Sequence, residues 1–179
     1  ILVGVGTVLG DDPMLNCRLP GGRDPVRVIC DSHLRTPLTA QVVTTAGEVP
    51  TLLATCETDP AGHAPYQAAG CRVLTLPEQA GRVDLGALLD ALGELEMDSL
   101  LLEGGGTLNW SFLEQRLVQS VYAYIAPKLL GGATAKSPVE GTGVPSPQAA
   151  FFLKNTRIQT LGEDFLLESE VDDRVHGDR

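Results

Sequence analysis

A strand-like run that ends in a carboxylate and three glycines is the segment of this sequence best suited to bind a charged ligand. Residues 99–102 read Ser-Leu-Leu-Leu, and Glu103 and three glycines follow before Thr107 opens a segment with helical apolar spacing. N–H groups at a helix N-terminus carry about half a positive charge and form a ready phosphate site. The motif therefore predicts a ligand with a phosphate and with a hydroxyl or amine that Glu103 can bind.

A plain turn is the simpler interpretation of the same motif. Thr107 would then be the N-cap of the helix, and Glu103 would be a solvated charge at the rim of the sheet. One glycine would suffice for such a turn, whereas three in succession let a ligand approach the backbone closely. The binding interpretation is therefore favoured.

Residues 4–13 place a second set of polar side chains directly after the first strand-like run. They read Gly-Val-Gly-Thr-Val-Leu-Gly-Asp-Asp-Pro, and one helical turn would put Thr7 and Asp11 on the same face. A capped helical turn that Asp-Asp-Pro simply ends explains the residues equally well. The dinucleotide fingerprint G-x-G-x-x-G is absent here, because Leu9 occupies the position of the third glycine and Gly10 comes one residue late.

A third motif, residues 31–37, follows the strand-like run 26–30. Ligands of open α/β sheets bind beyond the ends of such strands. Ser32 and Arg35 could hold a phosphate there, the arginine through its fork of donors. A turn with an exposed arginine accounts for the same residues equally well.

Six short apolar runs predict the strands that would position these motifs. Most are uninterrupted rather than alternating, as in strands covered on both faces. Residues 84–95 and 107–117 carry apolar side chains at helical spacing. This alternation predicts an α/β fold with a mostly parallel central sheet flanked by helices. The predicted strands are residues 2–5, 26–30, 51–54, 71–76, 99–102 and 121–125.

The C-terminal part of the chain has a different pattern. Residues 156–161 and 165–171 are strand-like, and the Gly-Glu-Asp between them predicts a C-terminal antiparallel hairpin. Residues 131–147 are rich in Gly, Pro, Ser and Thr and predict a long loop. No linker divides the chain, so we expect one domain over residues 1–171 and a polar tail over residues 172–179.

The composition argues against several classes of protein. The chain has 179 residues and a formal net charge of -10, whereas nucleic-acid binding needs clustered Lys and Arg. Its apolar runs are far shorter than the roughly 20 residues of a membrane-spanning helix. The four cysteines form no Cys-x-x-Cys pair and the three histidines lack ligand spacing. We therefore expect no metal site, no membrane or nucleic-acid partner, and a reducing, cytoplasmic environment.

In this order, the motifs resemble the reductase domain of the bifunctional riboflavin-biosynthesis deaminase/reductase. The matching stretches are residues 1–15, 31–37, 102–109 and 124–132, which span nearly the whole chain. The resemblance implies a dihydrofolate-reductase-like fold and a homodimer. It also implies an NADPH-dependent reduction of 5-amino-6-(5-phosphoribosylamino)uracil to the ribitylamino compound, in which a hydride passes to the ribose C1′.

The resemblance also implies which residues contact NADPH. Thr7 and Asp11 would lie near the nicotinamide, Ser32 at the adenosine and Arg35 at the 2′-phosphate. The glycine turn and the start of the following helix would bind the pyrophosphate. The residues of that segment are Gly105, Gly106, Thr107, Leu108, Asn109, Trp110 and Ser111.

Leu15, Arg18 and Glu103 are implied as contacts of the phosphoribosyl-pyrimidine substrate. Arg18 suits the ribose 5-phosphate, because a guanidinium binds phosphate through paired donors. Reduction of an imine or a ring-opened sugar also needs an acid that delivers a proton. Asp11 and Glu103 are the two candidate catalytic residues, and the sequence does not decide between them.

The chain departs from the family pattern in two places. Trp110 stands where the family often has a small residue, and the family's first strand, which holds a lysine near the reaction centre, would precede Ile1. We therefore expect a fragment of a longer protein. The alternatives are a related reductase of the same fold with another pterin-like or pyrimidine substrate, or a truncated, non-catalytic nucleotide-binding module. A glycine pair at this place in the fold can be cis, so we expect a cis peptide between Gly104 and Gly105.

Overall fold

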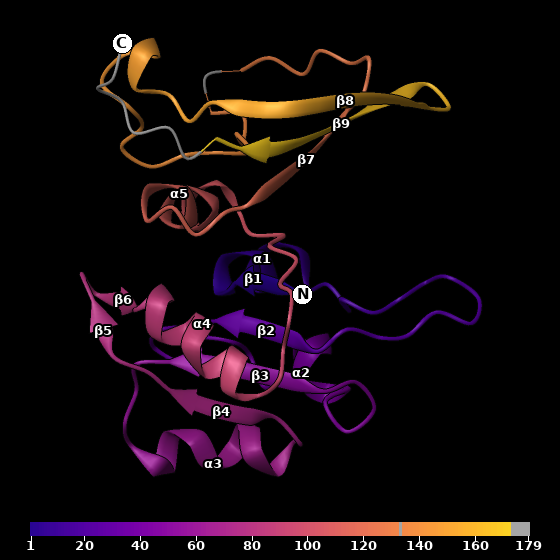
Figure 1. Cartoon of the computed structure of the whole chain (residues 1–179). Coiled ribbons are helices and arrows are strands. Elements are labelled where there is room, and N and C mark those ends of the chain that lie inside the picture. The colour runs from indigo at the N-terminus through magenta and orange to yellow at the C-terminus, as the bar shows by residue number, and fades with distance from the viewer. Residues whose placement is uncertain (133, 173–179) are drawn as a thin grey trace. The chain divides into compact units, whose positions relative to one another are not determined.

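The computed structural model describes residues 1–132 and 134–172 of the chain (Figure 1). The chain divides into two compact units, one from Ile1 to Leu108 and one from Asn109 onward. The boundary falls inside helix α5 (Gly106–Glu114). Each unit has its own principal β-sheet.

The first unit is centred on a parallel sheet of four strands: β1 (Leu2–Gly4), β2 (Arg27–Cys30), β3 (Thr51–Thr55) and β4 (Arg72–Thr75). They pair in the order β1-β2-β3-β4, and every neighbouring pair is parallel. Leu102 extends the sheet beyond β1 through one parallel bridge to Leu2. In this bridge the Leu2 N–H donates to Leu101 O at 2.8 Å, and the Glu103 N–H donates to Leu2 O at 2.9 Å.

Burial explains why these strands read as continuous apolar runs. Leu2, Val3, Val28, Ile29 and Leu53 have no exposed surface. A strand that is covered on both faces has no reason to alternate apolar with polar residues. The outer strand β4 is more exposed than its neighbours, and it begins with an exposed arginine.

Four helices flank this sheet: α1 (Val5–Asp11), α2 (Gln41–Thr44), α3 (Pro60–Ala68) and α4 (Leu85–Glu94). The side chains of Asp59 and Asp84 cap α3 and α4 by accepting backbone N–H bonds of their first turns. The leucine face predicted for α4 is buried. A short antiparallel pair, β5 (Glu78–Gln79) and β6 (Arg82–Val83), precedes α4.

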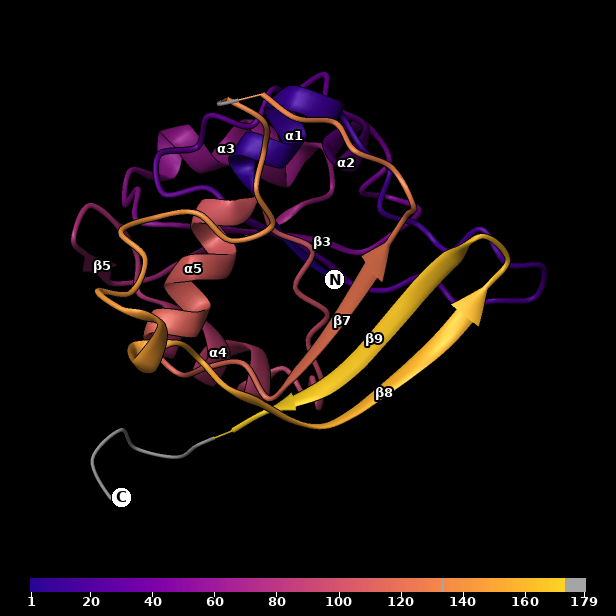
Figure 2. The ribbon, with the colours of Figure 1, turned by 90° about the horizontal axis from the view of Figure 1, so that it is seen from above.

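The second unit is centred on an antiparallel sheet of three strands: β7 (Ser120–Ile125), β8 (Leu153–Leu161) and β9 (Asp164–Val171). The strands pair in the order β7-β9-β8 and lie side by side in Figure 2. Gly162 has a φ of +65°, which suits the tight turn between β8 and β9. The predicted C-terminal hairpin is confirmed, and the predicted strand at residues 121–125 pairs with it as β7.

Three features of the fold differ from the expectations. The predicted strand at residues 99–102 contributes a single bridge, at Leu102. Helices α2 and α3 escaped prediction, because α2 spans one turn and α3 contains two prolines and a glycine, which obscure a helical pattern. Every peptide bond of the described residues is trans, so the expected cis bond between Gly104 and Gly105 is wrong.

The described residues of the segment between β7 and the short 3-10 helix η1 (Pro147–Ala149) form neither helix nor strand. This agrees with the long loop predicted over residues 131–147. Of the predicted polar tail, residues 173–179 lie outside the described residues. Across the part of the chain that the structure describes, no helix has the length and apolar character that crossing a bilayer requires.

Candidate functional site

Three of the predicted motifs meet at one edge of the parallel sheet. β1 pairs in parallel with β2 on one side and with Leu102 on the other. The three segments therefore end at the same edge, where they lead into Ser32, into α1 with Thr7, and into Glu103. We call this the carboxyl edge. The sequence predicted each motif separately, and the parallel pairing brings them together.

The direction of the chain across the sheet reverses between β1 and Leu102. From β1 the chain proceeds through β2, β3 and β4, and it then returns to the other side of β1. Open α/β sheets bind ligands at such switch points, outside the carboxyl ends of the strands. Glu103 and Gly105 follow the strand segment on one side of this point, and Gly6 follows β1 on the other.

Two glycines leave open space at the carboxyl edge. A Cβ added to Gly6 or to Gly105 would meet no heavy atom within 4 Å. Gly105 does not have a positive φ, so what distinguishes it is the missing side chain rather than a special backbone conformation. Gly4 differs, because an added Cβ would lie 3.6 Å from Leu108 Cδ2. The end of β1 thus packs against the start of α5, while the adjacent backbone can be approached by a ligand.

Glu103 lies just before the N-terminus of α5. Its side chain is exposed, and its backbone N–H is fixed by the bond to Leu2 O. The helix begins at the buried Gly106, and the Leu108 N–H donates to Gly105 O at 2.9 Å in its first turn. The positive end of a helix dipole therefore lies near an exposed carboxylate. This arrangement suits a ligand with both an anionic group and a hydrogen-bond donor.

Helix α1 places Thr7 and Asp11 one turn apart on the same face. Thr7 is half-buried in the first turn, whereas Asp11 is exposed at the last residue of the helix. The next residue, Asp12, has a left-handed φ of +40° and accepts the Gln41 N–H through Oδ1 at 2.8 Å. Asp12 therefore ties the end of α1 to the start of α2, and Asp11 presents its carboxylate to solvent.

The 31–36 loop, which follows β2, carries Ser32 and Arg35. Ser32 is half-buried, and its hydroxyl accepts the Val83 N–H of β6 at 3.1 Å. Its carbonyl accepts the Cys56 N–H at 3.1 Å. Arg35 is exposed. Ser32 thus joins this loop to its neighbours, while Arg35 projects a positive charge from it.

Buried polar groups hold the 31–36 loop from its inner side. Asp31 has no exposed surface, and its Oδ2 accepts the Thr36 N–H at 2.6 Å and the Thr36 Oγ1–H at 2.7 Å. The hydroxyl of Tyr66, from α3, lies 2.7 Å from Thr36 O and 3.0 Å from Leu34 O. Leu34 has a left-handed φ of +49°. The loop is therefore fixed from within by two side chains that the sequence analysis did not single out.

Burial also fixes the protonation of two groups at this edge. Burial, with the charge of Asp31 and the Cys71 thiol contributing, raises the pKa of the Tyr66 hydroxyl, which therefore remains a hydrogen-bond donor at neutral pH. Burial, with Asp31 and Cys56 contributing, raises the pKa of Cys30 to about 12. Cys30 is therefore a neutral thiol at neutral pH and is unsuited to act as a nucleophile.

A buried arginine organises the opposite end of β2. Arg27 has no exposed surface, and its guanidinium donates to four acceptors. They are Thr51 Oγ1 at 3.0 Å, Met14 O at 3.0 Å, Thr45 Oγ1 at 2.8 Å and Val49 O at 2.8 Å. The bond to Met14 holds the segment before Leu15 at the amino end of β2.

The predicted substrate contacts Leu15 and Arg18 lie on the loop that follows this anchor. Leu15 has a φ of +50° and packs against the core, whereas Arg18 is exposed. The Cys17 N–H donates to Asp24 Oδ1 at 2.7 Å and closes the base of the loop. In Figure 1 this loop extends from the amino ends of the strands. Thr7, Ser32 and Glu103 are brought together at the carboxyl edge, whereas Leu15 and Arg18 are not placed there.

The last three predicted cofactor residues, Asn109, Trp110 and Ser111, belong to the second unit. Asn109 Nδ2 donates to Pro138 O at 2.8 Å. The Trp110 ring meets the Phe151 ring edge to face, with centroids 6.1 Å apart and an interplanar angle of 75°. A Cβ on Gly141 would collide with the same indole. Trp110 therefore packs within its own unit, against the loop that the sequence predicted.

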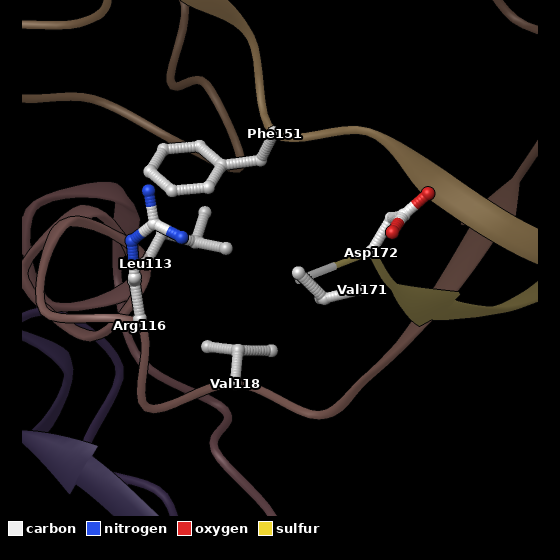
Figure 3. Close-up of a pocket in the computed structure, with 6 residues that line it drawn as sticks. All are labelled: Leu113, Arg116, Val118, Phe151, Val171 and Asp172. Carbon is white, nitrogen blue, oxygen red and sulfur yellow. The ribbon is translucent and has the colours of Figure 1, made fainter. Parts of the chain in front are cut away.

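A small hollow at the end of α5 is lined by residues of the second unit, and Figure 3 shows the Arg116 guanidinium beside the Phe151 ring with Asp172 across from it. The predicted site residues are not among those that line it. Within the described ranges, no group of three or more His, Cys, Asp or Glu side chains is placed to hold a metal ion.

Sequence reasoning missed Arg27, Tyr66 and the role of Asp31. One signal was present for Asp31, a carboxylate that directly follows an apolar strand run. Tyr66 gave no local signal, because its partners lie 30 and 32 residues away along the chain.

Comparison with known proteins extends these observations. The family model described as "RibD C-terminal domain" matches residues 1–167. The riboflavin biosynthesis protein RibD of Actinobacillus pleuropneumoniae is 49% identical over 171 residues, which cover 96% of this chain and 46% of that protein. The 2,5-diamino-6-ribosylamino-4(3H)-pyrimidinone 5′-phosphate reductase of Methanothermobacter thermautotrophicus is 40% identical over 176 residues, which cover 96% of this chain and 79% of that protein.

A solved structure of Acinetobacter baumannii RibD superimposes with a TM-score of 0.78 and 26% identity. The match covers 96% of this chain and 46% of that chain. The chain thus spans about half the length of the RibD proteins that it matches and most of the length of the reductase from Methanothermobacter.

Proposed function

The chain belongs to the RibD C-terminal domain family, and we propose that it carries the reductase activity of riboflavin biosynthesis. The proposed reaction is the NADPH-dependent reduction of 5-amino-6-(5-phosphoribosylamino)uracil to the ribitylamino compound. The observation that carries this proposal is the switch point of the sheet, where the Glu103–glycine turn and the start of α1 follow neighbouring parallel strand segments. The match to a protein named as a reductase, of which the chain covers 79%, supports it as well.

The residues at the carboxyl edge fit a phosphorylated dinucleotide. Gly6 and Gly105 leave room for a ligand against bare backbone, and α5 directs its positive end to the same place. Gly105, Gly106, Thr107 and Leu108 would bind the pyrophosphate through this segment. Thr7 and Ser32 would contact the two ends of the cofactor, and the exposed Arg35 would bind the 2′-phosphate that distinguishes NADPH from NADH. The predicted contacts from Asn109, Trp110 and Ser111 stay predictions.

When bound, NADPH supplies the hydride, and the protein supplies orientation and a proton. Glu103 follows the switch point directly, and its exposed carboxyl group can accept hydrogen bonds from the substrate when ionised or deliver a proton to the substrate when protonated. Asp11 lies one turn beyond Thr7, roughly 6 Å further along the axis of α1. We therefore assign the proton delivery to Glu103 and keep Asp11 as a cofactor contact.

The test is an NADPH-oxidation assay with the aminouracil substrate. Glu103→Gln should lower kcat at least tenfold with little effect on NADPH binding, whereas Asp11→Asn should mainly raise the KM for NADPH. Wild-type kcat in Glu103→Gln would remove Glu103 from catalysis. NADPH binding without any turnover of the unmodified chain would favour the non-catalytic module.

A second substrate deserves the same assay, because the reductase from Methanothermobacter is named for a 2,5-diamino-pyrimidinone. That compound and the aminouracil both carry the ribosylamino 5′-phosphate and differ in the pyrimidine. Faster reduction of the diamino compound would assign this chain to the same reaction as that relative. The predicted substrate contacts from Leu15 and Arg18 stay predictions, because both residues lie on the loop beyond the amino end of β2.

We further propose a cytoplasmic homodimer. The antiparallel sheet of the second unit carries exposed apolar side chains, among them Tyr124 at 69% and Ile158 at 68% exposure. Exposed apolar surface of this kind is typical of association surfaces. Sedimentation equilibrium measures the mass, and a monomer at micromolar concentration would contradict the dimer.

A further inference from the structure

The hydroxyl of Tyr66 joins the two carbonyl oxygens on either side of Arg35. It lies 3.0 Å from Leu34 O and 2.7 Å from Thr36 O. Tyr66 is 6% exposed, whereas Arg35 between the two carbonyls is exposed. A donor that binds the backbone on both sides of one residue fixes the direction in which that residue's side chain leaves the chain.

The rest of the 31–36 loop is held in a conformation that is costly to maintain. Leu34 adopts a left-handed φ, and Asp31 Oδ1 is buried without a hydrogen-bond partner among the described residues. The other carboxylate oxygen of Asp31 accepts two hydrogen bonds from Thr36. Strained backbone and unsatisfied buried groups persist where the surroundings over-determine them, and they gather at functional sites. The only exposed arginine or lysine of the 31–36 loop is Arg35, and the conformation of the loop determines where its side chain lies.

We propose that Tyr66 is a positioning residue that directs Arg35 toward the 2′-phosphate of NADPH. The inference rests on the proposed function, which gives the 2′-phosphate to Arg35. Tyr66 acts from α3 through the backbone of the loop and does not contact the cofactor. Its removal should therefore change the discrimination between NADPH and NADH rather than binding in general.

The test is Tyr66→Phe, which removes the hydroxyl and keeps the buried ring. Isothermal titration of the full chain should show the Kd for NADPH rising about fivefold, while the Kd for NADH stays within about twofold. A purely structural role would move both Kd values together or neither. Tyr122→Phe is the matched control, because it removes a hydroxyl that lies 3.3 Å from Glu168 Oε1, and it should change neither Kd.

Arg35→Ala supplies the second half of the test. It should abolish the preference for NADPH, and adding Tyr66→Phe to it should weaken NADPH binding no further, because coupled residues are not additive. A full fivefold effect of Tyr66→Phe in the Arg35→Ala background would overturn the inference. So would an unchanged NADPH-to-NADH ratio in Tyr66→Phe.

Thr36→Val loosens the same loop by a different route, through the lost hydroxyl bond to Asp31, and should shift the ratio in the same direction by a smaller factor. Equal affinity of the unmodified chain for NADPH and NADH would overturn the proposed cofactor and the inference together. Preference for NADPH with no effect of Tyr66→Phe would overturn the inference alone.

Discussion

The two ends of β2 bury a charged side chain in opposite ways. Arg27 begins the strand and Asp31 follows it, and neither has any exposed surface. The guanidinium of Arg27 donates to four acceptors, whereas Asp31 concentrates its bonds on Oδ2 and leaves Oδ1 without a partner among the described residues. A buried charged group is tolerated when its hydrogen bonds are satisfied and is costly when they are not.

The glycines near the two ends of β2 differ in how closely their surroundings pack against them. In the loop beyond the amino end, a Cβ on Gly22 would collide with Cys17 Sγ and would lie 3.1 Å from Leu19 O, so the loop would have to shift to accept it. At the carboxyl edge, a Cβ on Gly105 would meet nothing. The amino end is therefore closely packed and fully hydrogen-bonded around Arg27, whereas the carboxyl end keeps open space at Gly105 and a buried Asp31 oxygen without a partner among the described residues.

Arg27→Met should produce the largest loss of stability. The change leaves Val49 O and other acceptors in the interior without their donor, and each such group costs about 1–3 kcal/mol, so the free energy of unfolding should fall by about 3–5 kcal/mol. Guanidinium chloride denaturation measures it. Arg72→Met is the control on the exposed strand β4 and should change stability by no more than about 0.5 kcal/mol. Equal losses of stability in Arg27→Met and Arg72→Met would contradict a stabilising role of the buried guanidinium at the amino end of β2.

Asp31→Ala should cost less stability and more binding. Thr36 loses the acceptor of its buried N–H, while the burial of the carboxylate is relieved, so we expect a loss of about 2 kcal/mol in the free energy of unfolding. The Kd for NADPH should rise about tenfold, because the 31–36 loop is released.

Asp84→Ala is the control for this variant, since it removes the N-cap of α4 and should cost about 1 kcal/mol without changing the Kd. If Asp31→Ala destabilises the chain but binds NADPH as the unmodified chain does, the carboxyl end has a structural role only.

The strands of the first unit could be predicted because both of their faces are buried, which leaves continuous apolar runs such as Val28 and Ile29 in the sequence. Helix α4 was predictable for a similar reason, since its leucine face and its Asp84 cap lie within one segment. The pattern that identifies such elements is local. Helix α3 could not be predicted in this way, because its two prolines and its glycine obscure the helical pattern in the sequence.

The residues of the candidate site also divide into those with a local sequence signal and those without one. Glu103, Thr7 and Ser32 could be predicted, since each follows a strand-like run, and parallel pairing then brings them to one edge. The roles of Arg27 and Tyr66 could not, because their hydrogen-bond partners are 13 to 32 residues distant in the chain. A single sequence carries no record of which distant carbonyl a side chain will meet.

Gly105→Ala sharpens the contrast between the two glycines. The added methyl meets no atom of the protein, so the free energy of unfolding should change by less than about 1 kcal/mol. It would occupy the space proposed for the pyrophosphate, and the Kd for NADPH should rise at least tenfold, about 1.4 kcal/mol. Gly22→Ala should do the reverse, with a stability loss of about 1 kcal/mol and an unchanged Kd. An unchanged Kd in Gly105→Ala would move the pyrophosphate away from this turn.

Cys30→Ala should lower the free energy of unfolding by about 1 kcal/mol at neutral pH and should change how stability depends on pH. Burial raises the pKa of Cys30 from 9.0 to about 12. Above pH 9 the unfolded chain releases this proton while the folded chain retains it, so the stabilising contribution is full below pH 9 and is lost as the pH rises toward 12. One such group contributes at most about 1.4 kcal/mol per pH unit.

Denaturation at pH 7, 9 and 10.5 should therefore show a shallower decline in the free energy of unfolding for Cys30→Ala than for the unmodified chain. Parallel declines would mean that the partly buried thiol of Cys30 titrates in the folded chain as it does in the unfolded chain.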